Sequence, residues 1–578
     1  MKRLAHLCGF ALCLVSATDA RGQSTPAPDL VGLWAAKGRF GPDVAGRLVI
    51  DRPASGWRAS ISGRRADVRV ARDSVTFTLP DSSGAFIGRL NARQGRITGH
   101  WIQPRTVGEG ARYASPLTLE PCGRDCFAGT VVTRADELTF YLQVSRRVDG
   151  TLGAFLRNPE RNLGRFIRVD HVRASGSDVL LLDRRDSVLV RGVLRDDVLT
   201  VYFPTRGGSY DFHRVPDGAF TFFYPRGRPA ASYTYTPPLQ RGDGWPVGTL
   251  DQVGISREKI SAMIDSLIDT PADSLGAYKL HSLLIARHGR LVLEEYFYGE
   301  DADRPHETRS AGKTVTTVLV GAAIQAGMPI TPATPVYATM RPGAAVDARK
   351  RALTLEHLLT MSSGFDCDDS GNRPGDETNI IDQQENPDYY GIILGLNVIR
   401  EPGDSAVYCS INPHLAGGVL SRATGRSIPD LMDELVARPL EMRGYYIPLA
   451  PLGEAYMGGG WRFRTRDFMK LGQLYLNGGT WNGRRILGED WVRRSTAPRY
   501  PMGSTTRYGY LWWLREYPRE GRTVRAYYAS GNGGQFVVVI PELDMVIAAT
   551  GGNYNDSPGA VTVTDLIPRR ILPAVLGR

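Results

Sequence analysis

The segment "TRSAGKTV", residues 308–315, decides how the second half of this sequence folds and what it does. It places Ser310 and Lys313 three positions apart, just before the apolar run "VLVGAAIQAG" (318–327). A run this apolar predicts a buried helix, and Gly327 suits its C-terminal end. Residues i and i+3 lie on one face of a helix, so the lysine amine would lie beside the serine hydroxyl.

This pair has two interpretations. Burial and nearby positive charge lower the pKa of a lysine, and a neutral amine can then accept the serine's proton and activate it as a nucleophile. The helix N-terminus also favours negative charge developing at Ser310. Alternatively, Ser310 only caps the helix and Lys313 extends to solvent. The segment alone does not separate the two.

A second pair with the same spacing is Ser256 and Lys259. Ser256 directly opens "ISREKISAMIDSLID" (255–269), whose apolar residues fall at helical spacing: Ile260, Met263, Ile264, Leu267 and Ile268. We interpret Ser256 as the cap of this helix and Lys259 as a solvated residue of its first turn.

The first residues predict export. Lys2 and Arg3 precede an apolar run over 7–15 and then small residues, which is the pattern of a signal peptide over 1–22. The run is too short for a lasting membrane span, and we find no later one, so we expect an exported protein, periplasmic or secreted, without an integral membrane segment after cleavage. The remaining length is enough for two or three domains.

Four cysteines follow the leader: Cys122, Cys126, Cys367 and Cys409. An even count in an oxidising compartment predicts two disulfides, with Cys122 and Cys126 closing a small loop and the other two left for each other. A zinc site is the alternative, but no histidine lies near either pair at ligand spacing. We predict no metal and no cofactor.

The formal net charge of +10 comes mainly from arginine residues that are spread along the chain. No run of like charges and no block of arginine with aromatic residues is present, so we expect a solvated basic surface and no nucleic-acid partner.

The region 30–228 reads as an all-β accessory region. Segments such as "GRLVIDR" (46–52) and "VLTVYFP" (198–204) alternate apolar with polar residues. Two passages, about 30–120 and 125–225, resemble copies of one plan, which predicts a duplicated barrel or sandwich. This region contains no catalytic constellation.

A Pro/Gly/Tyr-rich linker over 229–250 separates this region from a domain over 251–578. "HSLLIARHGRLVLEEYFYG" (281–299) predicts a hairpin that turns near His288 and Gly289, and two more strands lie near the chain end, over 535–542 and 544–552. Strands at both ends with helices between them predict one α/β domain whose sheet is completed by distant parts of the sequence.

Two further stretches bear on Ser310. In "EPGDSAVYCSINPHLAGGVLSRATG" (401–425), Tyr408 follows a turn and precedes a helix that we expect Asn412 to cap and Gly425 to end. A phenol near an ammonium can relay a proton to a leaving group, although Tyr408 alone also fits a packed aromatic residue. In "SGNGGQ" (530–535), glycines at a strand edge let a substrate approach backbone N–H groups, although a plain hairpin turn has the same pattern.

Taken together, these motifs resemble the serine β-lactamase and penicillin-binding protein-like superfamily from about residue 254 to the end. Ser310-x-x-Lys313 matches the first motif and Tyr408-x-Ser410 the second, and residues 531–534 stand where the third is expected. The likeness is to the class C β-lactamase-related branch, with its family VIII esterases and 6-aminohexanoate-dimer hydrolases. It implies an α/β domain with an antiparallel sheet flanked by helices.

The resemblance also implies roles for individual residues. Ser310 would be the nucleophile, Lys313 its base and Tyr408 the proton relay to the leaving group. The N–H groups of Ser310 and Gln535 would form the oxyanion hole, and the substrate site would include Asn532, Gly533, Gly534 and Ser410. Cys409 adjoins Tyr408, so a Cys367–Cys409 disulfide would hold the tyrosine segment against the rim of the cleft.

Two positions depart from the family pattern. Ser410 stands where β-lactamases of this branch carry Asn, and Asn532 stands where a cation usually meets the substrate carboxylate. Both changes favour a serine hydrolase that cleaves an ester or small amide bond over a D-amino-acid peptidase or β-lactamase acting on cell-wall-type substrates. A non-catalytic ligand-binding protein is the other alternative, but the intact Ser310, Lys313 and Tyr408 set argues against it.

Overall fold

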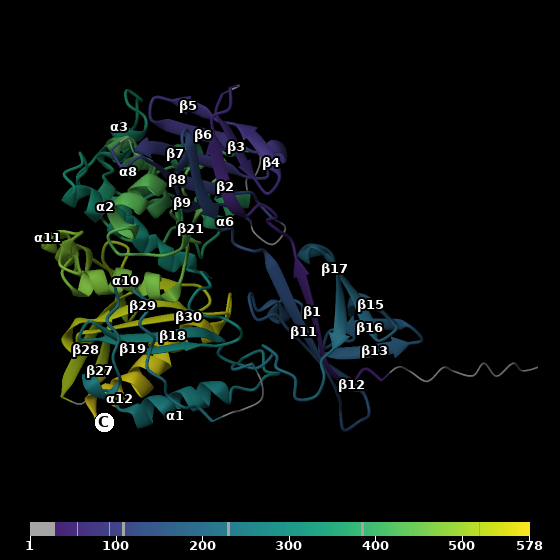
Figure 1. The fold of residues 1–578 in the computed structure, drawn as a ribbon. Helices are drawn as coiled ribbons and strands as arrows, with labels where there is room; N and C mark the ends of the chain where they lie inside the picture. Colours follow the sequence, from purple (N-terminus) through teal and green to yellow (C-terminus); the bar gives the residue numbers. More distant parts are fainter. Residues whose placement is uncertain are drawn as a thin grey trace, which may run out of the picture.

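The fold was analysed in a computed structural model that describes residues 29–577 except 55, 92, 107–109, 228–231, 383–385 and 520. The predicted signal peptide (1–22) lies outside the described residues. Within the described ranges, no helix is long and apolar enough to cross a membrane. The chain forms a small barrel, a separate β-sheet, and a larger part in which helices surround a second sheet (Figure 1).

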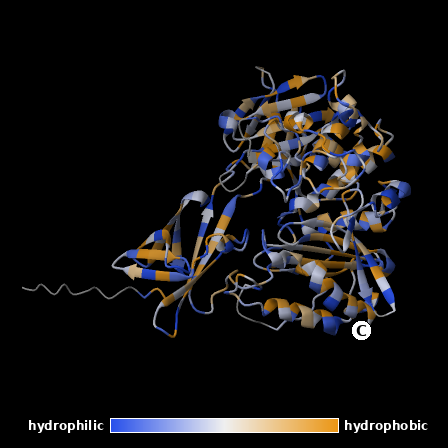
Figure 2. Cartoon of the chain, turned by 180° about the vertical axis from the view of Figure 1, so that it is seen from behind, coloured by the Kyte–Doolittle hydropathy of each residue, from blue (hydrophilic) through white to orange (hydrophobic). Residues whose placement is uncertain are grey.

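The barrel is closed by pairing between its first and last strands, β1 and β17. Hydrophobic and hydrophilic stretches alternate along its strands (Figure 2), because successive side chains point inward and outward. The aromatic rings of Phe140, Phe203 and Tyr210 pack in its core. In barrel order, the strands are β1 (Gly32–Arg39), β11 (Glu137–Arg146), β12 (Leu152–Arg157), β13 (His171–Ser175), β14 (Asp178–Leu182), β15 (Val188–Arg195), β16 (Val198–Phe203) and β17 (Gly208–Arg214).

A second, open sheet lies between β1 and β11 in the sequence and runs in the order β4-β3-β2-β10-β9-β8-β7-β6-β5. Phe86 and Trp101 are buried in its own core. Its strands are β2 (Gly46–Asp51), β3 (Arg58–Ile61), β4 (Arg64–Asp67), β5 (Arg69–Ala71), β6 (Ser74–Thr78), β7 (Ala85–Asn91), β8 (Arg96–Gln103), β9 (Arg112–Gly123) and β10 (Cys126–Val131).

The structure divides the accessory region differently from the two copies predicted over 30–120 and 125–225. Strand β1 of the first passage pairs with β11 of the second, and β10 of the second pairs with β2 of the first. The alternation of apolar and polar residues correctly predicts which segments are strands. It does not predict which strands pair, because each strand can form its hydrogen bonds with any neighbouring strand. The sheet β2–β10 is therefore an insertion between two barrel strands.

The larger part confirms the predicted α/β fold. Its antiparallel sheet runs β19-β18-β30-β29-β28-β27-β26-β25, and Ile285 of β18 lies opposite Ile547 of β30, so distant segments complete the sheet as predicted. The predicted hairpin at His288–Gly289 joins β18 and β19. The strands are β18 (Leu280–Arg287), β19 (Arg290–Tyr296), β25 (Tyr500–Pro501), β26 (Thr506–Tyr508), β27 (Trp513–Arg519), β28 (Arg522–Gly531), β29 (Gln535–Ile540) and β30 (Met545–Gly551).

Helices cover both faces of this sheet (Figure 1). One face packs against α1 (Arg257–Ile268), a π-helical stretch over Thr562–Ile571 and α12 (Leu572–Leu576). The other face packs against α10 (Thr465–Leu476). The remaining helices lie on that side: α2 (Thr314–Gln325), α3 (Val336–Met340), α4 (Ala348–Ala352), α5 (Leu355–Leu359), α6 (Glu377–Asp382), α7 (Tyr389–Gly395), α8 (Ile411–Thr424), α9 (Ile428–Leu431) and α11 (Glu489–Ser495).

Over the residues that the structure describes, the predicted linker packs against the larger part. Trp245 is buried and its indole N–H donates to the Arg466 carbonyl at 3.1 Å. Asp243 and Glu294 both bind the buried Arg466 guanidinium. Breaking ion pairs between buried charges would be costly, so this segment is packed firmly onto the larger part and does not act as a free linker.

Main-chain pairing joins the inserted sheet to the larger part. Strand β9 pairs with β21 (Tyr445–Leu449), β21 pairs with β22 (Arg462–Phe463), and β22 pairs with β20 (His306–Glu307). Strand β20 ends three residues before Ser310. One hydrogen-bonded sheet therefore runs from the accessory region to the strand that precedes the candidate nucleophile.

Ser256 caps α1 as predicted. Its hydroxyl accepts the Lys259 N–H at 3.3 Å, and the Lys259 amine donates to the Pro573 carbonyl at 3.3 Å. The five apolar residues predicted for this helix are all buried.

We expect the substitution Ser256→Ala to lower the free energy of unfolding by about 1 kcal/mol, because one N–H of the first turn loses its acceptor. A shift of the urea midpoint measured by tryptophan fluorescence checks this. An unchanged midpoint would contradict the capping role, and Ser261→Ala, inside the same helix, serves as the control.

Candidate active site

Ser310 lies in a tight turn held between two parts of the chain. The turn is a 3-10 stretch over Arg309–Lys313, and α2 begins only at Thr314, whereas the sequence suggested that Ser310 opens the helix itself. The Thr308 N–H donates to the Trp461 carbonyl at 2.8 Å, and the Gly460 N–H donates to the Arg309 carbonyl at 3.1 Å. These bonds fix the backbone on either side of the serine.

The structure brings Ser310, Lys313 and Tyr408 together. The Lys313 amine donates to the Ser310 hydroxyl at 2.8 Å and lies 5.1 Å from the centre of the Tyr408 ring. Lys313 is only 1% exposed, so it does not extend to solvent. Of the two interpretations of this pair, the solvated lysine is therefore excluded.

The electrostatics of Lys313 differ from the expectation. Burial lowers its pKa, as predicted, but the interactions with Tyr408, Glu377 and Asp369 raise it by more, and the net shift is upward. A carboxylate or phenol nearby favours the charged amine. The resting state is therefore an ammonium that donates to Ser310, not a neutral amine ready to accept a proton.

Asp369 is the main site residue that the sequence analysis missed. Its carboxylate accepts both the Ser410 hydroxyl at 2.6 Å and the Ser410 N–H at 2.8 Å. Burial raises its pKa, and Lys313 acts in the opposite direction. The sequence shows two acidic residues, Asp368 and Asp369, directly after Cys367. Nothing in their spacing along the chain predicts a contact with Ser410.

The start of α8 differs from the prediction. The helix begins at Ile411 with Ser410 at the capping position, and the side chain of Asn412 is buried inside the first turn. Pro413 is tolerated there because first-turn N–H groups need no helical acceptor. Gly425 ends the helix with a φ of 65°, as predicted.

Tyr408 is fixed by its backbone and by its ring. The neighbouring Val407 N–H donates to the Met361 carbonyl at 3.0 Å, which lies in the loop before Ser362. The ring packs against Trp513, with 5.4 Å between centroids. Tyr408 is therefore a packed aromatic residue whose ring also faces the Lys313 amine, and its role as a proton relay stays a prediction.

Both predicted cysteine pairs are bonded in the structure. Cys367 is bonded to Cys409 and Cys122 to Cys126. The first bond joins the residue after Tyr408 to the segment that carries Asp369. It therefore links two groups that surround Lys313.

The glycine-rich turn lies against the nucleophile. Strand β28 ends at Gly531, and a side-chain carbon there would lie 2.2 Å from the Thr308 carbonyl oxygen, so only glycine permits this approach. Gly533 and Gly534 have φ values of 95° and 107°, a region that favours glycine. Asn532 exchanges hydrogen bonds with Asn555, and the Gln535 side chain donates to the Gly551 carbonyl at 2.7 Å.

A cavity of about 450 Å³ opens at Ser310 and also reaches Asn532 and Glu377. Its size suits a small substrate. Lys313 and Tyr408 are not among the residues that line this cavity.

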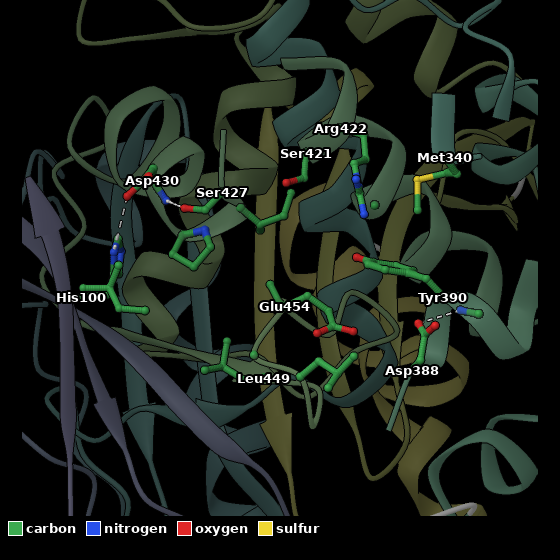
Figure 3. Close-up of a pocket in the computed structure, with 18 of the residues that line it drawn as sticks. His100, Met340, Asp388, Tyr390, Ser421, Arg422, Ser427, Asp430, Leu449 and Glu454 are labelled. Atoms are coloured by element: carbon green, nitrogen blue, oxygen red, sulfur yellow. Dashed lines mark hydrogen bonds and ion pairs between the residues drawn. The ribbon is translucent and has the colours of Figure 1, made fainter. Parts of the chain in front are cut away.

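A second cavity, of about 540 Å³, lies between strands β7 and β8 and helices α7–α9 (Figure 3). Its serines already have structural roles: the Ser421 hydroxyl donates to the Arg426 carbonyl at 2.8 Å, and Ser427 caps α9. Its described lining contains no lysine to pair with them. We assign no chemistry to it.

Among the described residues, His281, Glu300 and His306 form one group whose potential metal-ligand atoms lie within 4.8 Å. The two histidine rings are hydrogen-bonded to each other at 2.8 Å, and Glu300 pairs with Arg304. The spacing of the histidines along the chain gave no hint of this contact. Because each member already has a protein partner, we interpret the group as structural.

Comparison with known proteins identifies the family of this chain. The profile of the family described as Beta-lactamase matches residues 264–561, just over half of the chain. The chain therefore belongs to the beta-lactamase family, a family of hydrolases.

Parts of this chain are similar to one known hydrolase and to several solved structures. The 6-aminohexanoate-dimer hydrolase of Paenarthrobacter ureafaciens is 26% identical over 292 residues, which cover 46% of this chain and 71% of that protein. A family VIII carboxylesterase structure is 20% identical and covers 56% of this chain and 96% of its own, with a TM-score of 0.42. A penicillin binding protein from Bacillus halodurans is 15% identical and covers 50% and 97%, with a TM-score of 0.41.

The buried histidine pair predicts a pH dependence of stability. Burial, and for His281 also its neighbour His306, lowers the pKa of His281 to about 3, and burial lowers that of His306 to about 4. Between the ordinary value of about 6.5 and pH 4, the unfolded chain binds protons that the folded chain does not. The free energy of unfolding therefore falls as the pH falls, by up to about 1.4 kcal/mol per pH unit for each histidine.

Urea midpoints at pH 7 and pH 5 test this. We expect His306→Gln to reduce the difference between the two midpoints, whatever its effect at pH 7. An equal difference in both proteins would contradict the assignment.

Proposed function

We propose that this protein is an exported serine hydrolase that cleaves an ester or small amide bond through an acyl-serine intermediate. The observation that carries the proposal is the 2.8 Å contact between the buried Lys313 amine and the hydroxyl of Ser310, a residue that lines a cavity. Tyr408 faces the same amine. A serine, a base and a phenol in contact form the set that nucleophilic catalysis requires.

In the first step, the Ser310 oxygen attacks the substrate carbonyl carbon and its proton passes to the Lys313–Tyr408 pair. The raised pKa of Lys313 means that the amine holds a proton at rest. The pair can therefore take the serine's proton only in the state in which the amine and the phenol oxygen hold one exchangeable proton between them, so the two act as one proton-holding unit. When the tetrahedral adduct collapses, the unit returns a proton to the leaving alcohol or amine.

In the second step, the same unit takes a proton from a water molecule that attacks the acyl-serine carbonyl. The bond to Ser310 breaks, the serine regains its proton, and the acid is released. In both steps, the N–H groups of Ser310 and Gln535 are the proposed oxyanion donors. The contact of Gly531 with the nucleophile turn supports this, because it brings the start of β29 close to Ser310.

An ester or small amide is the preferred substrate class. Ser410 is held by Asp369 and Asn532 by Asn555, so neither site position offers a cation. The relative at 26% identity is named for hydrolysis of the 6-aminohexanoate dimer, a small molecule. Export is supported by the leader-like first residues and by two disulfides, which persist in oxidising compartments.

We expect Ser310→Ala to abolish labelling by a fluorophosphonate probe and to lower kcat/KM for a short-chain nitrophenyl ester by about 10⁴-fold or more. Tyr408→Phe keeps the ring but removes the hydroxyl, and we expect a loss of about 10²–10⁴-fold, mostly in kcat. Labelling is read by intact mass and turnover by nitrophenol release.

Ser256→Ala is the matched control, because it alters the other serine of the same motif and should keep both labelling and turnover. Absence of any adduct in the native protein would overturn the proposal and favour a non-catalytic ligand-binding protein. A panel of nitrocefin, a D-amino-acid anilide and the aminohexanoate dimer would then rank the amide substrates.

A further inference from the structure

Asp369 forms hydrogen bonds with both neighbours of Cys409. The Asp369 N–H donates to the Tyr408 carbonyl at 3.2 Å, and the carboxylate accepts the N–H and the hydroxyl of Ser410 at 2.8 Å and 2.6 Å. The Cys367–Cys409 disulfide joins the same two segments. Asp369 therefore fixes the segment that carries Tyr408 on either side of the disulfide.

The orientation of the Asp369 carboxylate is fixed at both of its oxygens. One oxygen accepts both bonds from Ser410, and the other accepts the Glu377 N–H at the start of α6, at 3.2 Å. Ser410 is only 1% exposed, so water cannot readily replace this acceptor. Without the carboxylate, two buried donors of Ser410 would lose the acceptor that they have in the structure, which is costly.

Asp369 is also one of the groups that determine the charge of Lys313. Burial alone would lower the pKa of this amine, but Tyr408, Glu377 and Asp369 raise it by more. Burial raises the pKa of the Asp369 carboxyl, while Lys313 and the Ser410 hydroxyl favour its ionised form. An ionised carboxylate near the ammonium makes it harder to remove the first proton from the Lys313–Tyr408 unit.

Other titratable groups around this unit have different contacts. Glu377 lines the cavity of the site and accepts the Tyr456 hydroxyl, so a change there would alter the cavity as well. The Tyr508 ring lies 6.3 Å from that of Tyr408, and burial raises the pKa of Tyr508 well above its usual range, so this phenol is uncharged. Asp369 is not among the residues that line the cavity, so its effects on the reaction pass through other residues.

We propose that Asp369 is a positioning residue of this hydrolase, which acts through Ser410 and Lys313 and does not touch the substrate. Its hydrogen bonds hold the segment of the proposed proton relay, and its negative charge keeps the Lys313–Tyr408 unit protonated up to a higher pH. This inference rests on the proposed function, because it concerns the reaction assigned to Ser310. The two roles separate experimentally, because asparagine removes the charge and alanine removes both the charge and the acceptor.

The pH dependence of kcat/KM for 4-nitrophenyl butyrate tests the role of the charge. Native kcat/KM should rise with pH as the Lys313–Tyr408 unit loses one proton, because only then can it take the proton of Ser310. Asp369→Asn removes a charge that favours the protonated unit, so we expect the midpoint of this rise to move to lower pH by about one pH unit. Nitrophenol is followed at its isosbestic wavelength, and the rate of Ser310→Ala is subtracted at each pH.

A comparison of Asp369→Asn with Asp369→Ala tests the role of the hydrogen bonds. Asparagine keeps an oxygen that can accept both donors of Ser410, so its kcat on the pH plateau should stay within about threefold of native. Alanine leaves both donors without this acceptor, and we expect kcat to fall by about tenfold or more while KM changes by less than about threefold. Urea midpoints show which variants are folded, and the pH measurement does not depend on the alanine variant.

Asp368→Asn is the matched control. The Asp368 carboxylate accepts the N–H and the hydroxyl of Ser370 at 2.9 Å and 2.7 Å, within its own turn. This variant removes the same charge one residue away from Asp369. It should keep the native midpoint of the pH profile and the native kcat.

The outcomes separate this inference from the proposed function. No Ser310-dependent turnover in the native protein would overturn the proposed function and this inference with it. Native turnover with an unmoved midpoint in Asp369→Asn, or with an equal shift in Asp368→Asn, would overturn this inference alone. A loss of kcat in Asp369→Ala that asparagine does not rescue, with an unmoved midpoint, would assign Asp369 a structural role only and would also overturn it.

Discussion

The backbone pairing of β9 with β21 is the contact on which the arrangement of this molecule depends. Through β21 and β22 it continues to β20, the strand that leads into the turn of Ser310. Main-chain hydrogen bonds allow little sliding once a register is set. The accessory sheet therefore has one fixed position beside the cavity at Ser310, whereas a domain attached only by a flexible loop could take many positions.

Burial of Lys313 is the second constraint on the structure, because it requires compensating groups around the amine. An ammonium removed from water must be compensated by nearby negative or polar groups, or it loses its proton. Here the compensation comes from Tyr408, Glu377 and Asp369, on segments separate in sequence from the lysine. The Cys367–Cys409 bond ties two of these segments together. The charge state of Lys313 is therefore a property of the whole fold around it.

The sequence revealed the parts of the site that depend on local spacing. Ser310 and Lys313 were found because i and i+3 share a face, and Ser256 was correctly assigned as a cap from its own helix. Asp369 was missed, and the direction of the Lys313 pKa was wrong, because both depend on groups that only tertiary packing brings together. For the same reason, strand alternation identified the β-rich region, but not the insertion of one sheet within the barrel.

Loss of the inserted sheet would leave the barrel intact but would expose a strand edge elsewhere in the molecule. Arg39 and Glu137 lie directly opposite each other on β1 and β11, so the inserted sheet leaves the barrel and returns to it at one point. A homologue that lost the insertion would retain a continuous barrel and the three candidate site residues Ser310, Lys313 and Tyr408. It would, however, expose the edge of β21, and unpaired strand edges recruit other chains. Loss of the insert would therefore tend to produce self-association through β21 before it affected the chemistry.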